Sequence, residues 1–354
     1  MAALLALGLA ACAEAPRQPV VGSPSEGLVF VARRDGNPDL HRLRLADGAV
    51  GPLVETPGRD ELWPFWSEAA RRLVFQSRAS GAHDDRLVLL DPESGRRETL
   101  PGPEGRNEQW AAWSPDGAAL AYVFVDRPGI AGTSGIGVFR PATGAVVEAV
   151  GAVDPVRFFR PEFAPDGRRL VAERTLGAGS TLWILEPGAA PRALGADRSG
   201  HEEKGRFTRD GAFVVYTRRT RPGARGELAV VASGGGGVRA LARRPGADDH
   251  SARPSPTRDE VVFISDRDGN PEAYRVALDG GAPRRLTHTP GRAEAAPHWS
   301  PDGEWIALTT RRLDAGVDPG ARDERIAVVD REGRLRLEIP GTMPDWMPPW
   351  PDGR

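Results

Sequence analysis

The chain has 354 residues with 47 basic and 49 acidic side chains, so its net charge is close to zero. This balance excludes wholesale nucleic-acid binding and a polyacidic tail. The 43 Gly and 33 Pro residues recur at fixed phases between short runs of Val, Leu and Phe, and helical periodicity is hard to find. The pattern predicts an all-β protein with many turns.

The first residues predict a lipid anchor. Residues 1–11 are almost wholly apolar and end in Leu9-Ala10-Ala11 before Cys12, which is the lone cysteine of the chain. This arrangement resembles the bacterial lipobox, in which the cysteine is acylated and becomes the mature N-terminus. Plain secretion after Ala15 and an accidental apolar start are the alternatives. We assign residues 1–12 to a signal peptide with a lipobox.

Residues 13–24 follow as a short tether. Pro16, Pro19 and Pro24 give this segment the composition of an extended linker. Ala13, rather than Asp, follows the cysteine, and in Gram-negative lipoproteins that resemblance implies sorting to the outer membrane. We therefore expect an extracytoplasmic protein that is anchored in the outer membrane and faces the periplasm or the cell surface.

A repeat of about 47 residues fills residues 25–354. Its signature is Trp-Ser-Pro-Asp-Gly, which begins at Trp113 and Trp299 and is varied after Phe163 and Phe207. The units start at 23, 67, 114, 164, 208, 255, 300 and 351, so the spacing stays between 44 and 51 residues. A fixed period of this length indicates a repeat architecture.

Each unit predicts four short strands. Pro-Asp-Gly makes a tight turn, because Pro presets its φ and Gly tolerates a positive φ, and apolar runs such as Leu120–Val123 follow it. Four such strands form one blade of a β-propeller. The last run, Asp345–Trp350, is expected to complete the first blade and to leave no open sheet edge. We predict seven blades closed in this way, with six or eight as alternatives.

The repeat resembles that of TolB-type β-propellers. The resemblance rests on Pro-x-Trp-Ser-Pro-Asp-Gly, then a strand, then Ser-Asp-Arg-Asp-Gly-Asn at 265–270, and it covers nearly the whole chain after the tether. The family namesake has six blades after an α/β domain, for which this sequence leaves no room. The prolyl oligopeptidase family carries similar propellers ahead of a hydrolase domain, which is also missing.

Motifs for catalysis do not occur in the sequence. There is no Gly-x-Ser-x-Gly elbow, no His-Glu-x-x-His and no paired cysteine, and none of the six histidines is spaced as a metal ligand to another. Asp266–Asn270 faintly resembles a calcium loop, but a hairpin turn fits it better. We expect no cofactor, and a divalent cation in the channel stays open as an alternative.

One position of the repeat is mostly acidic. It lies five residues before each aromatic of the signature, at the start of the innermost strand, and the copies should ring one mouth of the central channel. The copies are Glu61, Glu108, Phe158, Glu202, Asp249, Glu294 and Asp345. Such a ring could bind a cation or a cationic peptide, because a shared cation relieves the repulsion between carboxylates.

A structural role for this ring is the alternative. The next strand ends on the same face and carries Arg33, Arg78, Arg219 and Arg311 at matching positions, which favours ion pairs between blades. Trp63, Trp110 and Trp346 lie nearer the channel mouth, and His250 follows Asp249. These residues are candidates for contacting a partner.

Two functions fit these features. The first is a non-catalytic scaffold that binds a protein or peptide of the cell envelope, and the longest insertions, 126–135 and 312–323, are where we expect the contacts with the partner. The second is an enzyme with its site in the channel, such as a metal-dependent lyase or lactonase. The sequence favours the scaffold, and we expect it to be monomeric.

Overall fold

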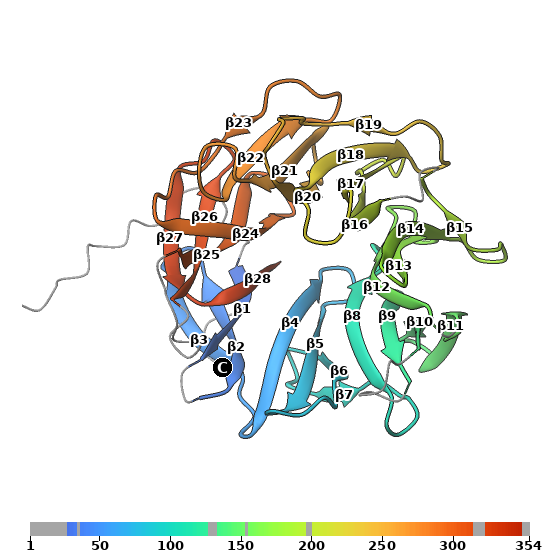
Figure 1. Ribbon diagram of the computed structural model, residues 1–354. Helices are drawn as coiled ribbons and strands as arrows, with labels where there is room; N and C mark the ends of the chain where they lie inside the picture. Colours follow the sequence, from blue (N-terminus) through green and yellow to red (C-terminus); the bar gives the residue numbers. More distant parts are fainter. Residues whose placement is uncertain are drawn as a thin grey trace, which may run out of the picture.

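The computed structural model describes residues 27–33, 36–126, 133–152, 155–195, 200–313 and 323–348. All 28 elements in these ranges are β-strands. Figure 1 shows them arranged in a ring as sets of neighbouring strands, and one strand of each set, the innermost strand, lies nearest the centre. The prediction of an all-β propeller is confirmed. Within the same ranges, no helix has the length and hydropathy of a membrane span.

Five sheets have four strands each. The strand orders are β28(Thr342–Met347), β1(Gly27–Arg33), β2(Pro38–Arg44), β3(Ala49–Val54); β4(Arg59–Ser67), β5(Arg72–Ala79), β6(Arg86–Leu90), β7(Arg97–Thr99); β8(Asn107–Trp113), β9(Leu120–Val125), β10(Ser134–Arg140), β11(Ala145–Val150); β20(Asp249–Pro254), β21(Glu260–Ser265), β22(Glu272–Ala277), β23(Arg284–Arg285); and β24(Arg292–Trp299), β25(Trp305–Arg312), β26(Glu324–Asp330), β27(Leu335–Pro340).

The sixth sheet has eight strands. It contains β12(Arg157–Phe163), β13(Leu170–Leu176), β14(Gly179–Leu185), β15(Arg192–Ala193), β16(His201–Phe207), β17(Phe213–Arg219), β18(Glu227–Ala232) and β19(Arg239–Ala240). A single parallel pair, Ser180 with His201, joins its two halves. The prediction of seven blades is therefore corrected: the described residues form five separate four-stranded blades and one sheet of eight strands, because β14 and β16 come within hydrogen-bonding distance.

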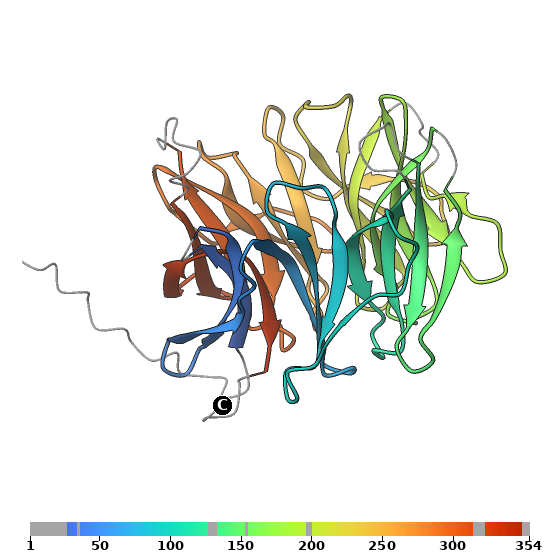
Figure 2. The same ribbon diagram turned by 90° about the horizontal axis from the view of Figure 1, so that it is seen from below.

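The C-terminal strand lies in the same sheet as the N-terminal one. β28 pairs antiparallel with β1, and the partners include Leu28 with Trp346 and Val29 with Asp345. Residues from the two ends of the described chain thus complete one four-stranded set. Seen from the side, the sheets stand next to one another around a common axis (Figure 2).

The repeated turn has a direct physical explanation. The Ser114 hydroxyl accepts a hydrogen bond from the Ala119 N–H at 2.9 Å and donates one to Asp116 at 2.6 Å, while Asp116 accepts from the Ala118 N–H at 3.0 Å. Gly117 has a φ of 67°, and a Cβ there would lie 2.4 Å from the Ala70 nitrogen of the preceding sheet. In this turn Ser therefore closes the loop by hydrogen bonds, Asp accepts the N–H of a following residue, and Gly supplies the positive φ.

The repeated tryptophans join neighbouring innermost strands. The indole N–H groups of Trp113, Trp299 and Trp346 donate to the carbonyls of Phe65, Arg253 and His298 at 3.3, 3.0 and 3.0 Å. Each acceptor lies on the innermost strand of the preceding set. Trp346 is thus the last signature aromatic of the ring, and Trp350, which was assigned to this place, lies outside the described residues. Trp350-Pro-Asp-Gly resembles the motif, so the sequence pattern places the last unit four residues too late.

The core lies between sheets. Leu28 and Phe30 of β1, for example, pack with Ala307 of β25 and with Ile326 and Val328 of β26. The described residues form seven such buried clusters, each between two sets of strands that follow one another around the ring. Burial of this apolar surface between neighbours is the main force that holds the ring together.

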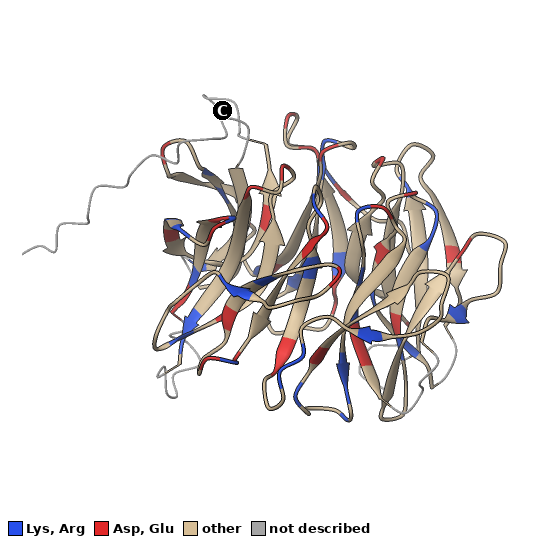
Figure 3. Ribbon diagram, turned by 90° about the horizontal axis from the view of Figure 1, so that it is seen from above, with Lys and Arg blue, Asp and Glu red and all other residues tan. Residues whose placement is uncertain are grey.

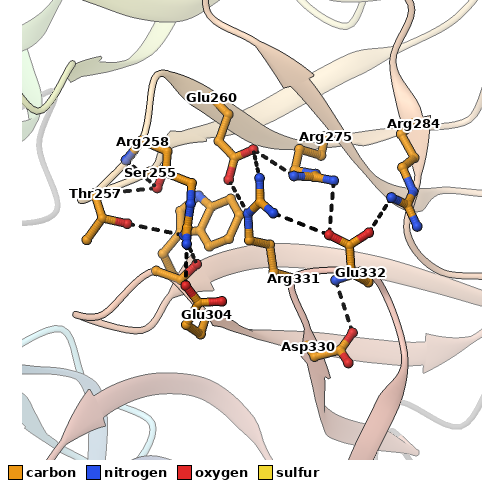
Figure 4. Close-up of polar contacts among 12 residues, drawn as sticks. Ser255, Thr257, Arg258, Glu260, Arg275, Arg284, Glu304, Asp330, Arg331 and Glu332 are labelled. Atoms are coloured by element: carbon orange, nitrogen blue, oxygen red, sulfur yellow. Dashed lines mark hydrogen bonds and ion pairs between the residues drawn. The ribbon is translucent and has the colours of Figure 1, made fainter.

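Ion pairs add to this packing at the surface. Glu260 of β21, which is 8% exposed, accepts from Arg331 at 2.9 and 3.0 Å and from Arg275 at 2.8 Å, and Glu332 also pairs with both arginines (Figure 4). Arg331 follows β26, so this network ties two adjacent sheets. Both signs of charge are interspersed over the whole molecule (Figure 3), in keeping with its small net charge.

Candidate functional site

A β-bulge at one position divides each innermost strand into two parts. One residue there has a positive φ between 47° and 55°, and the pairing with the next strand shifts register at the same place in at least six sets. We call these residues the bulge tier: Trp63, Trp110, Arg160, Lys204, Ser251, Ala296 and Met343. A bulge re-aims the side chains on either side of it, so the parts of the strand contact different neighbours.

Two residues before the bulge lies the position that is mostly acidic in sequence. Its described side chains are 0–4% exposed, and its members are Glu61, Glu108, Phe158, Glu202, Asp249 and Glu294. We call the five acidic members the carboxylate clasps. They do not form the expected exposed ring at a channel mouth, because the strand turns them into the space between sheets.

Three of the clasps bind the preceding set of strands. Glu108 accepts from the Leu87 N–H of β6 at 3.1 Å, Glu202 accepts from the Leu182 N–H of β14 at 2.8 Å, and Glu294 accepts from the Ala273 N–H of β22 at 2.9 Å. In each case the donor lies on the third strand of the set before. This contact supports the structural alternative for the acidic position, with backbone N–H groups rather than arginines as the repeated partner.

Asp249 departs from this scheme. Its carboxylate accepts from the Ser265 hydroxyl at 2.5 Å and from Arg267 at 3.0 Å, both within its own sheet or the loop that follows it. The expected basic partners are placed elsewhere: Arg219 pairs with Glu203 and Asp248, and Arg78 pairs with Asp60. Arg219 and Arg78 therefore form ion pairs near the strand ends with carboxylates other than the clasps, and the arginines that pair with clasps are Arg86 with Glu108 and Arg267 with Asp249.

Burial controls the protonation of the clasps. It raises the pKa of Glu61, Glu108 and Asp249 above the ordinary carboxyl range. It raises the pKa of Glu294 to about 7, and the neighbouring Glu272 contributes in the same direction. These carboxyl groups are committed to neighbouring strands and are removed from solvent, so we exclude them from the candidate site.

Asp345 belongs to a different position from the other acidic residues. Met343 is the bulge residue of β28, so the counterpart of the clasps is Gly341, where a Cβ would meet the Phe30 ring at 2.6 Å. Asp345 instead immediately precedes Trp346. The slip of the sequence alignment by four residues explains why it was grouped with the clasps.

The position immediately before the signature aromatic carries a run of polar side chains. We call it the axial belt, and on five successive innermost strands it consists of Glu162, Arg206, Arg253, His298 and Asp345. All five are partly exposed, and the two remaining positions hold Phe65 and Ala112. These titratable residues recur at one position of the repeat, so the belt is visible in the sequence. Neither the spacing of the histidines nor the acidic position five residues before the aromatic reveals it.

Contacts connect the belt from strand to strand. Arg206 forms an ion pair with Glu162, Arg253 lies 2.6 Å from Nε2 of His298, and Nδ1 of His298 lies 3.4 Å from Asp345. Asp345 also accepts from the Trp66 N–H of β4 at 2.8 Å. The belt thus links β24 to β4 across β28.

The tautomer of His298 follows from these partners. Arg253 has only N–H donors, so Nε2 must accept and the proton sits on Nδ1, facing Asp345. Burial, together with the charge of Arg253, lowers the pKa of His298 to about 4. The imidazole is therefore neutral at neutral pH and oriented by a cation on one side and a carboxylate on the other.

The bulge tier differs between the two sides of the ring. Trp63 is 42% exposed, and the Trp110 ring lies 4.9 Å from Phe159, with Arg160 5.6 Å from its centre. On the following strands, Lys204 donates to the Ser251 hydroxyl at 3.0 Å, and this hydroxyl also lies 3.0 Å from His250. The tier is therefore aromatic on β4 and β8 and polar on β16 and β20.

Of the predicted contact residues, Trp63 is accessible, while Trp110 and His250 are partly buried. Trp346 is buried and donates to a carbonyl, so its role is structural. Burial lowers the pKa of His250 to about 4. Nowhere in the described part of the chain do three or more His, Cys, Asp or Glu side chains gather in a group that could hold a metal ion.

Comparisons with known proteins agree with the fold. Residues 158–317 match the family described as TolB beta propeller domain. The Tol-Pal system protein TolB of Desulfosudis oleivorans is 34% identical over 91 residues, which are 25% of this chain and 19% of that protein. The chain therefore matches only about a fifth of the length of this relative.

Solved structures extend the similarity to most of the chain. TolB from Acinetobacter baumannii has a TM-score of 0.55 at 16% identity, over 95% of this chain and 88% of that one. An oligogalacturonate lyase in complex with manganese has a TM-score of 0.64 at 16% identity, over 80% of this chain and 82% of that one. At such identities the likeness concerns the fold. Together with the sequence match, it supports a TolB-type β-propeller.

A clasp should make stability depend on pH. The pKa of Glu294 is about 7 in the folded protein and near 4.5 in an unfolded chain, so its favourable contribution is complete below pH 4.5 and is lost as the pH rises through 7. Full loss amounts to about 3 kcal/mol. Glu294→Gln should therefore flatten this part of the curve of unfolding free energy against pH, measured by urea denaturation.

Glu104→Gln, at an exposed turn, is the matched control and should leave the curve unchanged. Parallel curves for the wild type and Glu294→Gln between pH 4.5 and 8 would show that this carboxyl titrates normally.

Proposed function

We propose that the chain is a non-catalytic, TolB-like scaffold that binds a protein or peptide of the cell envelope. The observation that carries the proposal is Trp63, a large aromatic side chain left 42% exposed on an innermost strand. Amphipathic aromatic side chains are enriched where proteins meet partners. Around the same tier, Trp110, Arg160 and Lys204 offer ring faces and positive charge, which suit a segment with apolar and acidic side chains.

We further propose that the ring has seven blades and is closed. The two halves of the eight-stranded sheet then act as separate blades, since a single residue pair joins them. The seven buried clusters between successive sets and the pairing of β28 with β1 support this arrangement. Closure gives β1 a partner on its inner side, so this strand offers no free edge there for self-association, which favours a monomer.

We propose that the scaffold is extracytoplasmic and anchored through Cys12. The support is the lipobox-like sequence at 9–12 and the similarity to TolB-type propellers. Residues 1–26 lie outside the described residues, as do most of the two insertions expected to contact a partner.

A change at Trp63 should weaken partner capture. Trp63→Ala should reduce the yield of a partner crosslinked to the protein in envelope extracts by about tenfold, because a central aromatic anchor often contributes more than 1.4 kcal/mol. Leu335→Ala on the outermost strand β27 removes a side chain that is 60% exposed and is the control. Equal capture by both variants would mean that the partner binds elsewhere.

Replacement of the cysteine tests the location. Cys12→Ser removes the only thiol that could carry a lipid, so the variant should move from the membrane fraction to the soluble envelope fraction. Immunoblotting of fractionated cells measures this. A variant that still sediments with membranes, and is released by neither salt nor high pH, would contradict the lipid anchor.

The alternative function is catalysis near the axis. It is favoured by the His298–Asp345 pair beside Arg253, which places an oriented neutral imidazole next to a cation. The scaffold proposal predicts that purified protein contains no stoichiometric divalent metal and that Ca²⁺ or Mn²⁺ leaves the melting temperature unchanged. Bound Mn²⁺ with a raised melting temperature, both reduced in His298→Gln, would favour the enzyme.

A further inference from the structure

A second site lies away from the axial belt and Trp63. A cavity of about 580 Å³ opens between the end of β17, the start of β18 and residues 243–247, which lead from β19 to β20. Its volume is typical of a site for a small molecule. We propose that this cavity, which we call the arginine cavity, binds a small polyanion that carries two or more carboxylate or phosphate groups.

The cavity wall is rich in guanidinium groups and poor in accessible carboxylates. The lining arginines are Arg218, Arg219, Arg225, Arg243 and Arg244, and the lining acids are Glu227 and Asp249. Asp249 is 1% exposed and its oxygens accept from Ser265 and Arg267, so it is turned away from a ligand. Glu227 is therefore the carboxylate of the wall that a ligand would meet.

Glu227 lies between two arginines and contacts both. It pairs with Arg218 at 2.7 Å and lies 3.5 Å from Arg243. One carboxylate between two guanidinium groups leaves a local excess of positive charge. The Arg243 side chain is 77% exposed, so a ligand can approach it without displacing protein.

Three other lining arginines form ion pairs with carboxylates that lie outside the cavity. Arg219 pairs with Asp248 at 2.8 Å, Arg225 pairs with Asp266 at 2.5 Å, and Arg244 pairs with Asp268 at 2.9 Å, and none of these acids lines the cavity. The Arg225 and Arg244 side chains remain 58% and 52% exposed. A guanidinium has five N–H donors, and such pairs use one or two of them. The outer carboxylates thus fix the arginines while leaving donors for a ligand.

These features define the ligand class. Arginine binds planar carboxylates and phosphates through two parallel hydrogen bonds, and ordering it in advance lowers the entropic cost of binding. A single acidic group would compete with Glu227 for one arginine at a time. An anion with several acidic groups can contact Arg243, Arg244 and Arg225 together, so it should bind more tightly.

Isothermal titration calorimetry on the full chain tests the site. Citrate and pyrophosphate are the probes, and they distinguish a preference for carboxylates from one for phosphates, while raffinose is the neutral control. We expect saturable binding of at least one anion with one molecule per chain, and no binding of raffinose. Binding should weaken as NaCl is raised, because these guanidinium groups are accessible to solvent.

The variant Arg243→Gln/Arg244→Gln should weaken binding by about tenfold or more, since each lost charge-assisted hydrogen bond is strong. The control Arg96→Gln/Arg168→Gln removes the same charge at exposed positions outside the cavity and should change the affinity less than about twofold. Unchanged melting temperatures establish that both variants fold. Absence of saturable binding of both anions, or equal affinity of the cavity variant and the wild type, would overturn the proposal. Neither result would bear on Trp63 and its partner.

Discussion

Each set of strands in this ring must be held against the set before it, and buried carboxylates on the innermost strands make a repeated polar contact that does so beside the apolar packing. Glu108, Glu202 and Glu294 each accept a backbone N–H from the third strand of the preceding set. A buried backbone donor without a partner would cost free energy, and each carboxylate provides an acceptor for such a donor. The same burial raises the pKa of Glu108 and Glu294. The protein therefore tolerates the electrostatic cost of burying these carboxylates, which hold each set of strands against the one before it.

The β-bulge next to each clasp decides what the rest of the strand can do. Without it, alternation along the strand would place residues two and four positions after Glu294 on the same face as this carboxylate. With it, Glu294 lies between sheets while His298 contacts Arg253 and Asp345 on the neighbouring innermost strands. A single repeated distortion thus separates the residues that assemble the ring from those that face its axis. The non-glycine residues that adopt a positive φ there carry a conformational cost that packing must offset.

The candidate surfaces for binding differ in how they are built. Near the axis, Lys204 and Ser251 of the bulge tier come from different strands and meet because the strands converge, while Trp63 is exposed on another strand of the tier. The arginine cavity lies at strand ends and in a connecting loop, and its shape depends on acids such as Asp248 and Asp266 that hold arginines from behind. Loops at the ends of propeller strands are free to vary without disturbing the sheets, which suits them to ligand recognition.

The sequence by itself determined the repeat, the strands and the turns, because these depend on local chemistry. Ser114, Asp116 and Gly117 hydrogen-bond or bend within a few residues of one another, so their pattern is readable without the fold. The tertiary structure decided where the side chains of the innermost strands point. A bulge shifts the alternation of side chains by one residue, and Glu294 beside it lies buried between sets of strands. A short copy of the motif near the end of the chain also makes the sequence pattern assign Asp345 to a position of the repeat four residues away from its true one. The arginine cavity was likewise invisible in sequence, since Arg218, Arg225 and Arg243 are brought together only by the pairing of β17 with β18 and the return of the chain to β20.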